Sequence, residues 1–104
     1  MVSKSRDAVK ILPHPTFVYT AKFHPNSEEI ICTAGYDKVL RIWSISRVGQ
    51  YGLLVQELQG HMGYVNSICF SFDGLKLYSA DSIGSIISWH SNVTGAAYGK
   101  GMTN

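Results

Sequence analysis

Charged side chains are scarce in this chain of 104 residues, where they make up only 15% of the sequence. The formal net charge is +2, and no run of lysine or arginine concentrates it. A nucleic-acid-binding protein would normally carry a dense basic patch, so we expect no nucleic acid partner. The low share of charge is instead typical of strands that are covered on both faces.

Long apolar runs are absent as well, and none approaches the length that spans a bilayer. Residues 1–10 are polar and lack the apolar segment of a signal peptide. We therefore expect a cytoplasmic chain with no membrane insertion. In that setting the only two cysteines, Cys32 and Cys69, should be reduced and buried thiols.

The apolar periodicity of an amphipathic helix is missing too, and we expect essentially no helix. Short segments rich in valine, isoleucine and aromatic residues alternate with glycine, aspartate, asparagine or proline, a pattern that predicts strands and turns. The predicted strands cover residues 17–23, 29–34, 38–44, 53–58, 64–70, 75–80 and 84–90, with a weak final strand around 96–98.

One pattern occurs twice along the chain. The segment from His14 to Phe23 aligns with the segment from His61 to Phe70, with histidine, valine and phenylalanine at the same spacing. Each copy ends on a tryptophan, and the period is roughly 46 residues, which suits a four-stranded propeller blade. The sequence therefore predicts a repeat architecture.

The Gly60-His61 pair and the closing tryptophans resemble the WD-repeat β-propeller family. The resemblance covers residues 9–90 and implies an all-β chain with two four-stranded antiparallel blades, part of an incomplete propeller. The implied organisation is a polar leader at 1–8, a first WD repeat at 9–58, a second at 59–98 and a flexible tail at 99–104.

The same resemblance implies that a buried hydrogen-bonded tetrad ties each blade together. In the first copy its members would be His14, Thr33, Asp37 and Trp43. The indole N–H only donates, a hydroxyl and a neutral imidazole both donate and accept, and a carboxylate only accepts. A chain of bonds from tryptophan to aspartate can therefore close with every member satisfied.

The second copy matches this set only in part. It offers His61, Ser79 and Trp89, but Ile83 stands where the aspartate belongs. Asp81 lies two residues earlier and would need a different turn to replace it. We therefore expect an incomplete second tetrad and a stiffer first blade.

The sequence pattern gives little support for a metal, phosphate-binding or catalytic site. The thiols and imidazoles lack metal-ligand spacing, and Gly99-Lys100-Gly101 lacks the spacing of a phosphate loop. His14, Asp37 and Thr33 resemble part of a catalytic triad, but their recurrence at blade spacing favours architecture. We expect no enzyme and no catalytic, cofactor or metal site. The thiols and imidazoles that lack metal-ligand spacing are His14, His24, Cys32, His61, Cys69 and His90.

Three aromatic residues, Phe17, Tyr36 and Tyr64, stand where WD propellers tend to contact partners. An exposed ring at such a place would be a good anchor for a protein partner. The alternative is that these rings only cover strand edges. Trp43, Trp89, Phe23 and Phe70 instead fit the packed interior between blades.

The function implied is a non-catalytic protein-interaction scaffold. The run at 12–19, Leu-Pro-His-Pro-Thr-Phe-Val-Tyr, is similar to a WD-repeat scaffold of the cilium. It implies a role in cilium assembly within basal-body or transition-zone complexes. The alternative is a WD-repeat subunit of another assembly, such as a ubiquitin-ligase adaptor or a trafficking coat. The expected partners are other proteins rather than a small-molecule substrate, and uncovered blade faces favour self-association.

Overall fold

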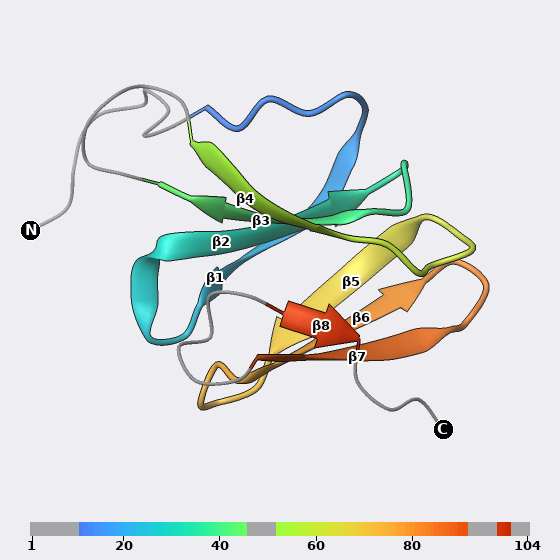
Figure 1. The fold of residues 1–104 in the computed structure, drawn as a ribbon. Helices are drawn as coiled ribbons and strands as arrows, with labels where there is room; N and C mark the ends of the chain where they lie inside the picture. Colours follow the sequence, from blue (N-terminus) through green and yellow to red (C-terminus); the bar gives the residue numbers. More distant parts are fainter. Residues whose placement is uncertain (1–10, 46–51, 92–97, 101–104) are drawn as a thin grey trace, which may run out of the picture.

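The computed structural model describes residues 11–45, 52–91 and 98–100, which form two four-stranded antiparallel sheets (Figure 1). In each sheet the strands pair in chain order. The first sheet contains β1 (Val18–His24), β2 (Ser27–Gly35), β3 (Leu40–Ser44) and β4 (Leu53–Leu58). The second contains β5 (Val65–Phe70), β6 (Lys76–Asp81), β7 (Ile86–Ser91) and β8 (Tyr98–Lys100). The expected all-β class is confirmed.

Seven predicted strands are found, and their ends lie within two residues of the predicted positions. The eighth strand, β8, starts at Tyr98, the last residue of the predicted weak strand. The leader at 1–8, residues 96–97 of that strand and residues 101–104 of the tail lie outside the described residues. In the part of the chain that is described, no helix has the length and hydropathy to cross a membrane.

The turn between β5 and β6 shows how the sequence closes a hairpin. The Asp73 carboxylate accepts hydrogen bonds from the Ser71 hydroxyl, at 2.7 Å, and from the Leu75 N–H, at 3.0 Å. Gly74 follows at a φ of 78°, in the left-handed region that glycine adopts without a steric penalty. The Asp73-Gly74 pair therefore sets the turn locally.

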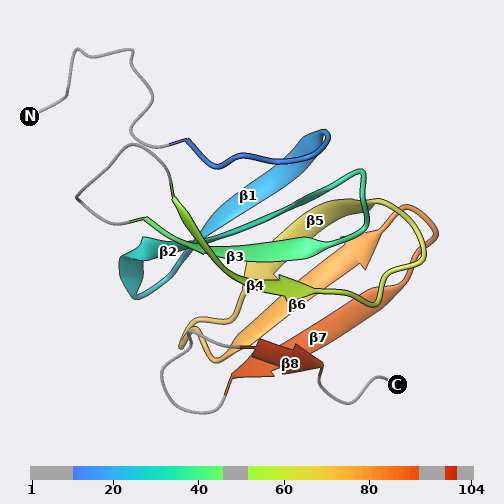
Figure 2. The same ribbon diagram turned by 45° about the horizontal axis from the view of Figure 1, so that its top comes forward.

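The two sheets stack face to face, and the core lies between them (Figure 2). Residues paired across antiparallel strands share a face, so Cys32 and Ile42 belong to one side of the first sheet. Leu77 and Trp89 belong in the same way to one side of the second. Both sides contribute to a single apolar cluster, made of Cys32, Ala34, Leu40, Ile42, Leu58, Val65, Ile68, Leu77, Ile87, Trp89 and Tyr98.

A side-chain clamp joins the last strands of the two sheets. The Gln56 side-chain oxygen on β4 accepts a hydrogen bond from the Tyr98 backbone N–H at 2.7 Å, and the Gln56 amide nitrogen donates to the Tyr98 carbonyl. The Tyr98 hydroxyl donates to the Gly74 carbonyl at 2.5 Å. Burial raises the pKa of Tyr98 to about 12, so the phenol keeps the proton that it donates. These bonds fasten β8 to both sheets.

Two expectations about burial are corrected. Cys69 is exposed, because it pairs with Tyr78 on the face of the second sheet that points away from the first. Phe23, which the sequence places in the packed interior, is 56% exposed because it lies on the outer face of the first sheet, opposite Ile31. A strand pattern alone does not say which face another sheet will cover.

Candidate functional site

The first blade contains a chain of three hydrogen bonds that runs through His14. The Trp43 indole donates to the Thr33 hydroxyl oxygen at 2.9 Å, and the Thr33 hydroxyl lies 2.7 Å from His14 Nε2. His14 Nδ1 lies 2.6 Å from the Leu12 carbonyl, which can only accept, so Nδ1 carries the proton and Nε2 accepts from Thr33. The chain therefore ends on a backbone oxygen.

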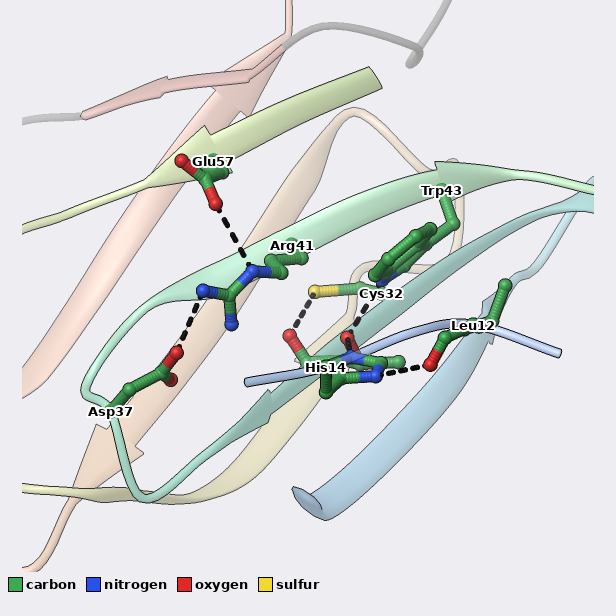
Figure 3. A network of polar contacts seen from close by, with 8 residues as sticks. Leu12, His14, Cys32, Asp37, Arg41, Trp43 and Glu57 are labelled. Carbon is green, nitrogen blue, oxygen red and sulfur yellow. Dashed lines mark hydrogen bonds and ion pairs between the residues drawn. The ribbon is translucent and has the colours of Figure 1, made fainter. Parts of the chain in front are cut away.

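Asp37, the fourth residue expected in this tetrad, lies elsewhere. One of its oxygens is 2.7 Å from an Arg41 guanidinium nitrogen, and Arg41 Nε donates to Glu57 at 3.1 Å. Figure 3 shows Arg41 between the two carboxylates while His14 faces Leu12. Burial alone would raise the pKa of Asp37, but the hydrogen bond and charge of Arg41 lower it below its usual value.

The second blade closes its chain with an acid that the sequence placed outside the tetrad. The Trp89 indole donates to Ser79 at 2.9 Å, and the Ser79 hydroxyl lies 2.6 Å from His61 Nε2. His61 Nδ1 then donates to Asp81 Oδ2 at 2.9 Å. The expectation that this blade lacks an acid is therefore corrected, because Asp81 supplies it.

Asp81 also organises the turn that follows it. The other oxygen of its carboxylate accepts from the backbone N–H groups of Ile83, at 3.1 Å, and Ser85, at 2.9 Å. Burial alone would raise the pKa of Asp81, but the hydrogen bond from His61 and those from the backbone lower it to about 2. The carboxylate therefore serves both as the end of the buried chain and as the centre of the turn.

Two sequence differences explain why the blades diverge. Asp81 pairs with Val65, and in the first blade the position with the same register is Gly35, opposite Val18. A Cβ at Gly35 would collide with the backbone carbonyl of Phe17, so no acidic side chain fits there. The second difference is Arg41, which occupies the place of the buried Ile87 and holds Asp37 away from His14.

Four aromatic rings lie in contact where the two blades meet, and we call them the aromatic row. The Phe17 and Tyr36 rings meet edge to face at 6.4 Å between centroids, and Tyr36 stacks on Tyr64 at 6.3 Å. Tyr19 meets Tyr64 edge to face at 5.5 Å. All four are exposed, and Phe17 most of all at 72%. The structure thus brings the three predicted partner-binding residues together and adds Tyr19.

An open groove of about 770 Å³ runs beside the aromatic row. Its sides come from the β2–β3 turn of the first blade and the β6–β7 turn of the second, so it spans the seam. Its lining is mainly apolar and aromatic, which is typical of binding sites. The lining residues are Pro15, Thr16, Tyr36, Asp37, Lys38, Met62, Gly63, Tyr64, Ser82 and Ile83.

The groups that could hold a metal or act as nucleophiles are dispersed. Among the residues described, no three His, Cys, Asp or Glu side chains form a cluster suited to a metal ion. Burial raises the pKa of the Cys32 thiol, which keeps it protonated and unreactive. His24 is buried at the seam, with its ring 5.4 Å from that of Phe70, and Nδ1 accepts from the Asn26 N–H at 3.1 Å.

Comparison with known proteins decides the family. The family model described as "WD domain, G-beta repeat" matches residues 6–44 and 52–93. The chain belongs to the WD-repeat family. Each match ends within a few residues of a closing tryptophan, Trp43 on β3 or Trp89 on β7. Each sheet contains one of these tryptophans, and the two sheets are therefore WD-repeat blades.

Relatives of this WD-repeat chain are much longer proteins. It is 46% identical over 89 residues to jouberin from Mus musculus, an alignment that covers 86% of the chain and 8% of jouberin. It is 35% identical over 80 residues to the small ribosomal subunit protein RACK1 of Caenorhabditis elegans, covering 76% of the chain and 23% of that protein. The chain thus spans less than a quarter of each of these two relatives.

A solved structure shows the same arrangement of strands. Sqt1 of Saccharomyces cerevisiae superposes with a TM-score of 0.75 at 24% identity, over 88% of this chain and 24% of Sqt1. At that identity the likeness speaks for the fold alone. It shows that two stacked sheets of this WD-repeat kind occur as part of a larger structure.

Proposed function

We propose that this chain is a non-catalytic protein-interaction module whose partners dock at the groove between the blades. The observation that carries the proposal is the exposed aromatic row beside the groove. Exposed aromatic rings held on rigid strands are frequent anchors in protein interfaces, and WD-repeat proteins generally bind other proteins. The proposed partners are proteins rather than nucleic acid, membrane or a small-molecule substrate.

The assembly that we propose is ciliary. The similarity to jouberin, together with the specific run at 12–19, supports a scaffold role in cilium assembly at the basal body or transition zone, with the chain otherwise cytoplasmic. The alternative is a subunit or adaptor of another assembly, such as a ubiquitin ligase or a trafficking coat. The weaker similarity to RACK1, whose name places it in the small ribosomal subunit, supports that wider class.

Tagged chains in cultured ciliated cells test both parts of the proposal. The double variant Phe17→Ala/Tyr36→Ala removes two rings of the aromatic row and should abolish enrichment at the ciliary base. Phe72→Ala is the matched control, because Phe72 is 96% exposed in the β5–β6 turn, far along the strands from the groove. It should leave the enrichment unchanged.

The two parts can fail separately. A wild-type chain spread evenly through the cytoplasm would contradict the ciliary role, and proximity labelling would then point to another assembly. Equal enrichment of wild type and double variant would contradict docking at the aromatic row. Circular dichroism of each variant checks that the sheets remain folded.

Self-association is a second candidate, and the outer face of the first sheet favours it. Phe23 and Leu54 are exposed on the side that faces away from the second sheet. An exposed apolar strip of this kind is an association hazard. Light scattering after size-exclusion chromatography should show oligomers that diminish in Phe23→Ser/Leu54→Ser. A concentration-independent monomer would contradict this candidate.

A further inference from the structure

The groove carries one positive charge that is not part of any ion pair among the described residues. Its two charged lining residues are Asp37 and Lys38. Asp37 is already paired with Arg41 at 2.7 Å, and Arg41 lies within the blade. Lys38 is exposed and forms no ion pair with any residue that the structure describes. The unpaired charge that the groove presents to a ligand is therefore that of Lys38.

The backbone at Lys38 is also in an unusual state. Lys38 has a φ of 73°, in the left-handed region, which is unfavourable for a residue with a Cβ. The second blade places Gly84 at the equivalent position of its own turn, with a φ of 93°. Glycine would satisfy the same backbone at no steric cost, so the first blade keeps a lysine side chain in spite of its conformation. Strain of this kind is often found at functional sites.

Apolar surface lies beside this charge. Tyr36 and Tyr64 stack along one wall of the groove, and Met62 and Ile83 are exposed along its lining. A ligand that fits both features needs an apolar group for the rings and an anionic group for the ammonium. A short peptide supplies both on neighbouring side chains.

We propose that the groove binds an extended peptide segment that packs an apolar side chain against Tyr36 and Tyr64 and sets an aspartate or glutamate carboxylate beside Lys38. The proposal rests on the proposed function and names the chemistry of its partner. A basic peptide is the opposite case, since aromatic faces also attract cations. Charge decides between the two, because Lys38 repels a basic side chain.

The test is an NMR titration of the 104-residue chain labelled with ¹⁵N. Three capped peptides are compared, each with a central leucine flanked by glutamates, glutamines or lysines. The glutamate peptide should bind most tightly and shift the amides of the β2–β3 and β6–β7 turns. One exposed ion pair contributes little, so we expect a roughly two- to fivefold advantage over the glutamine peptide that declines with added salt.

Variants assign the advantage to one side chain. Lys38→Gln and Lys38→Gly should both remove the preference for glutamate. Lys38→Gly should do so without lowering Tm, since a φ of 73° suits glycine. Lys76→Gln is the matched control, because Lys76 is an exposed lysine at the opposite end of β6 and should leave the preference intact.

Each remaining outcome overturns a defined claim. Equal binding of the three peptides, or tightest binding of the lysine peptide, overturns the acidic partner while leaving the groove as a docking site. An unchanged preference in Lys38→Gly overturns the role of Lys38. If no peptide shifts the groove amides at millimolar concentration, the acidic partner and docking at the groove both fail.

Discussion

The two blades share a strand order and a Trp–hydroxyl–His chain, yet they end that chain differently. In the second blade Asp81 accepts hydrogen bonds from the His61 ring and from two backbone N–H groups of its turn. In the first blade the His14 ring donates its hydrogen bond to the Leu12 carbonyl, and Asp37, the acid of the turn, forms an ion pair with Arg41. The buried Asp81 side chain therefore joins the second blade's hydrogen-bonded chain to its turn. In the first blade the turn is bonded to Arg41 instead and presents Lys38 at the groove.

This difference reverses the expected order of rigidity. The sequence favours a stiffer first blade because its four tetrad residue types are all present. The hydrogen bonds instead make Asp81 the most connected carboxylate of the two turns. We predict that the second blade is the more resistant to unfolding.

The largest loss of thermal stability should come from Asp81→Asn. The amide keeps the shape of the carboxylate but removes its charge, so one of the donors from His61, Ile83 and Ser85 loses its acceptor inside the blade. We expect Tm to fall by roughly 10 °C, against about 2 °C for the matched change Asp37→Asn, which leaves Arg41 paired with Glu57. Thermal denaturation followed by circular dichroism measures both. An equal or larger fall for Asp37→Asn would contradict the proposed ranking.

Acid should weaken the second blade through the same carboxylate. The pKa of Asp81 is about 2 in the folded chain, below the value of about 3.9 for an unfolded aspartate. A lowered pKa stabilises the fold above the unfolded value, and this contribution is lost as the pH falls from about 4 towards 2. Urea denaturation at pH 5, 3.5 and 2.5 should show this loss in wild type. Asp81→Asn should show a flatter profile, and parallel profiles would argue against the assignment.

Gly35→Ala tests why the first blade has no acid at this register. The added Cβ would collide with the Phe17 carbonyl, and a backbone atom moves less readily than a side chain. Overpacking of this kind costs roughly 1–3 kcal/mol. Gly99→Ala is the control, because a Cβ at Gly99 meets nothing within 4 Å. Urea denaturation should separate the two variants, and similar midpoints would show that the strands can move apart.

Gln56→Leu should loosen the clamp between the blades. The substitution removes both hydrogen bonds to the Tyr98 backbone, at a cost of roughly 1–2 kcal/mol. Hydrogen exchange at the Tyr98 amide should become faster, while amides inside β2 keep their protection. Gln59→Leu is a matched change at an exposed glutamine. Unchanged exchange at Tyr98 would mean that β8 is held without the clamp.

Much of this architecture could be predicted from the sequence, because the repeat places equivalent residues at equal spacing. His14, Thr33 and Trp43 come together as three consecutive members of one chain, as do His61, Ser79 and Trp89. These contacts depend on strand register, which the period determines. The partner-binding prediction for Phe17, Tyr36 and Tyr64 had another source, the resemblance to WD propellers, in which such positions tend to contact partners.

The partners of the acidic side chains could not be predicted from the repeat, because a long side chain can contact residues on more than one strand. Arg41 reaches both Asp37 and Glu57, and no spacing rule shows that it outcompetes His14 for Asp37. The signal available was a pair of differences between the repeats: Gly35 stands at the register position of Asp81, and Arg41 at that of Ile87. Tyr19 was missed because its ring crosses the seam to reach Tyr64, a contact that exists only once the blades are stacked.

Arg41→Ile should have the smallest effect on stability, and it bears most directly on the comparison. It gives the first blade the residue of the second and leaves Asp37 and Glu57 without their cation. Both carboxylates keep contact with solvent, so we expect a loss of no more than about 1 kcal/mol. The pKa of Asp37, which Arg41 lowers, should rise towards the usual value of about 3.9. Carboxyl ¹³C NMR titration measures that rise, and Arg41→Lys, which keeps the charge, should retain part of the lowering. An unchanged Asp37 pKa in Arg41→Ile would mean that the backbone of the turn, and not Arg41, determines the environment of Asp37 and so the difference between the two blades.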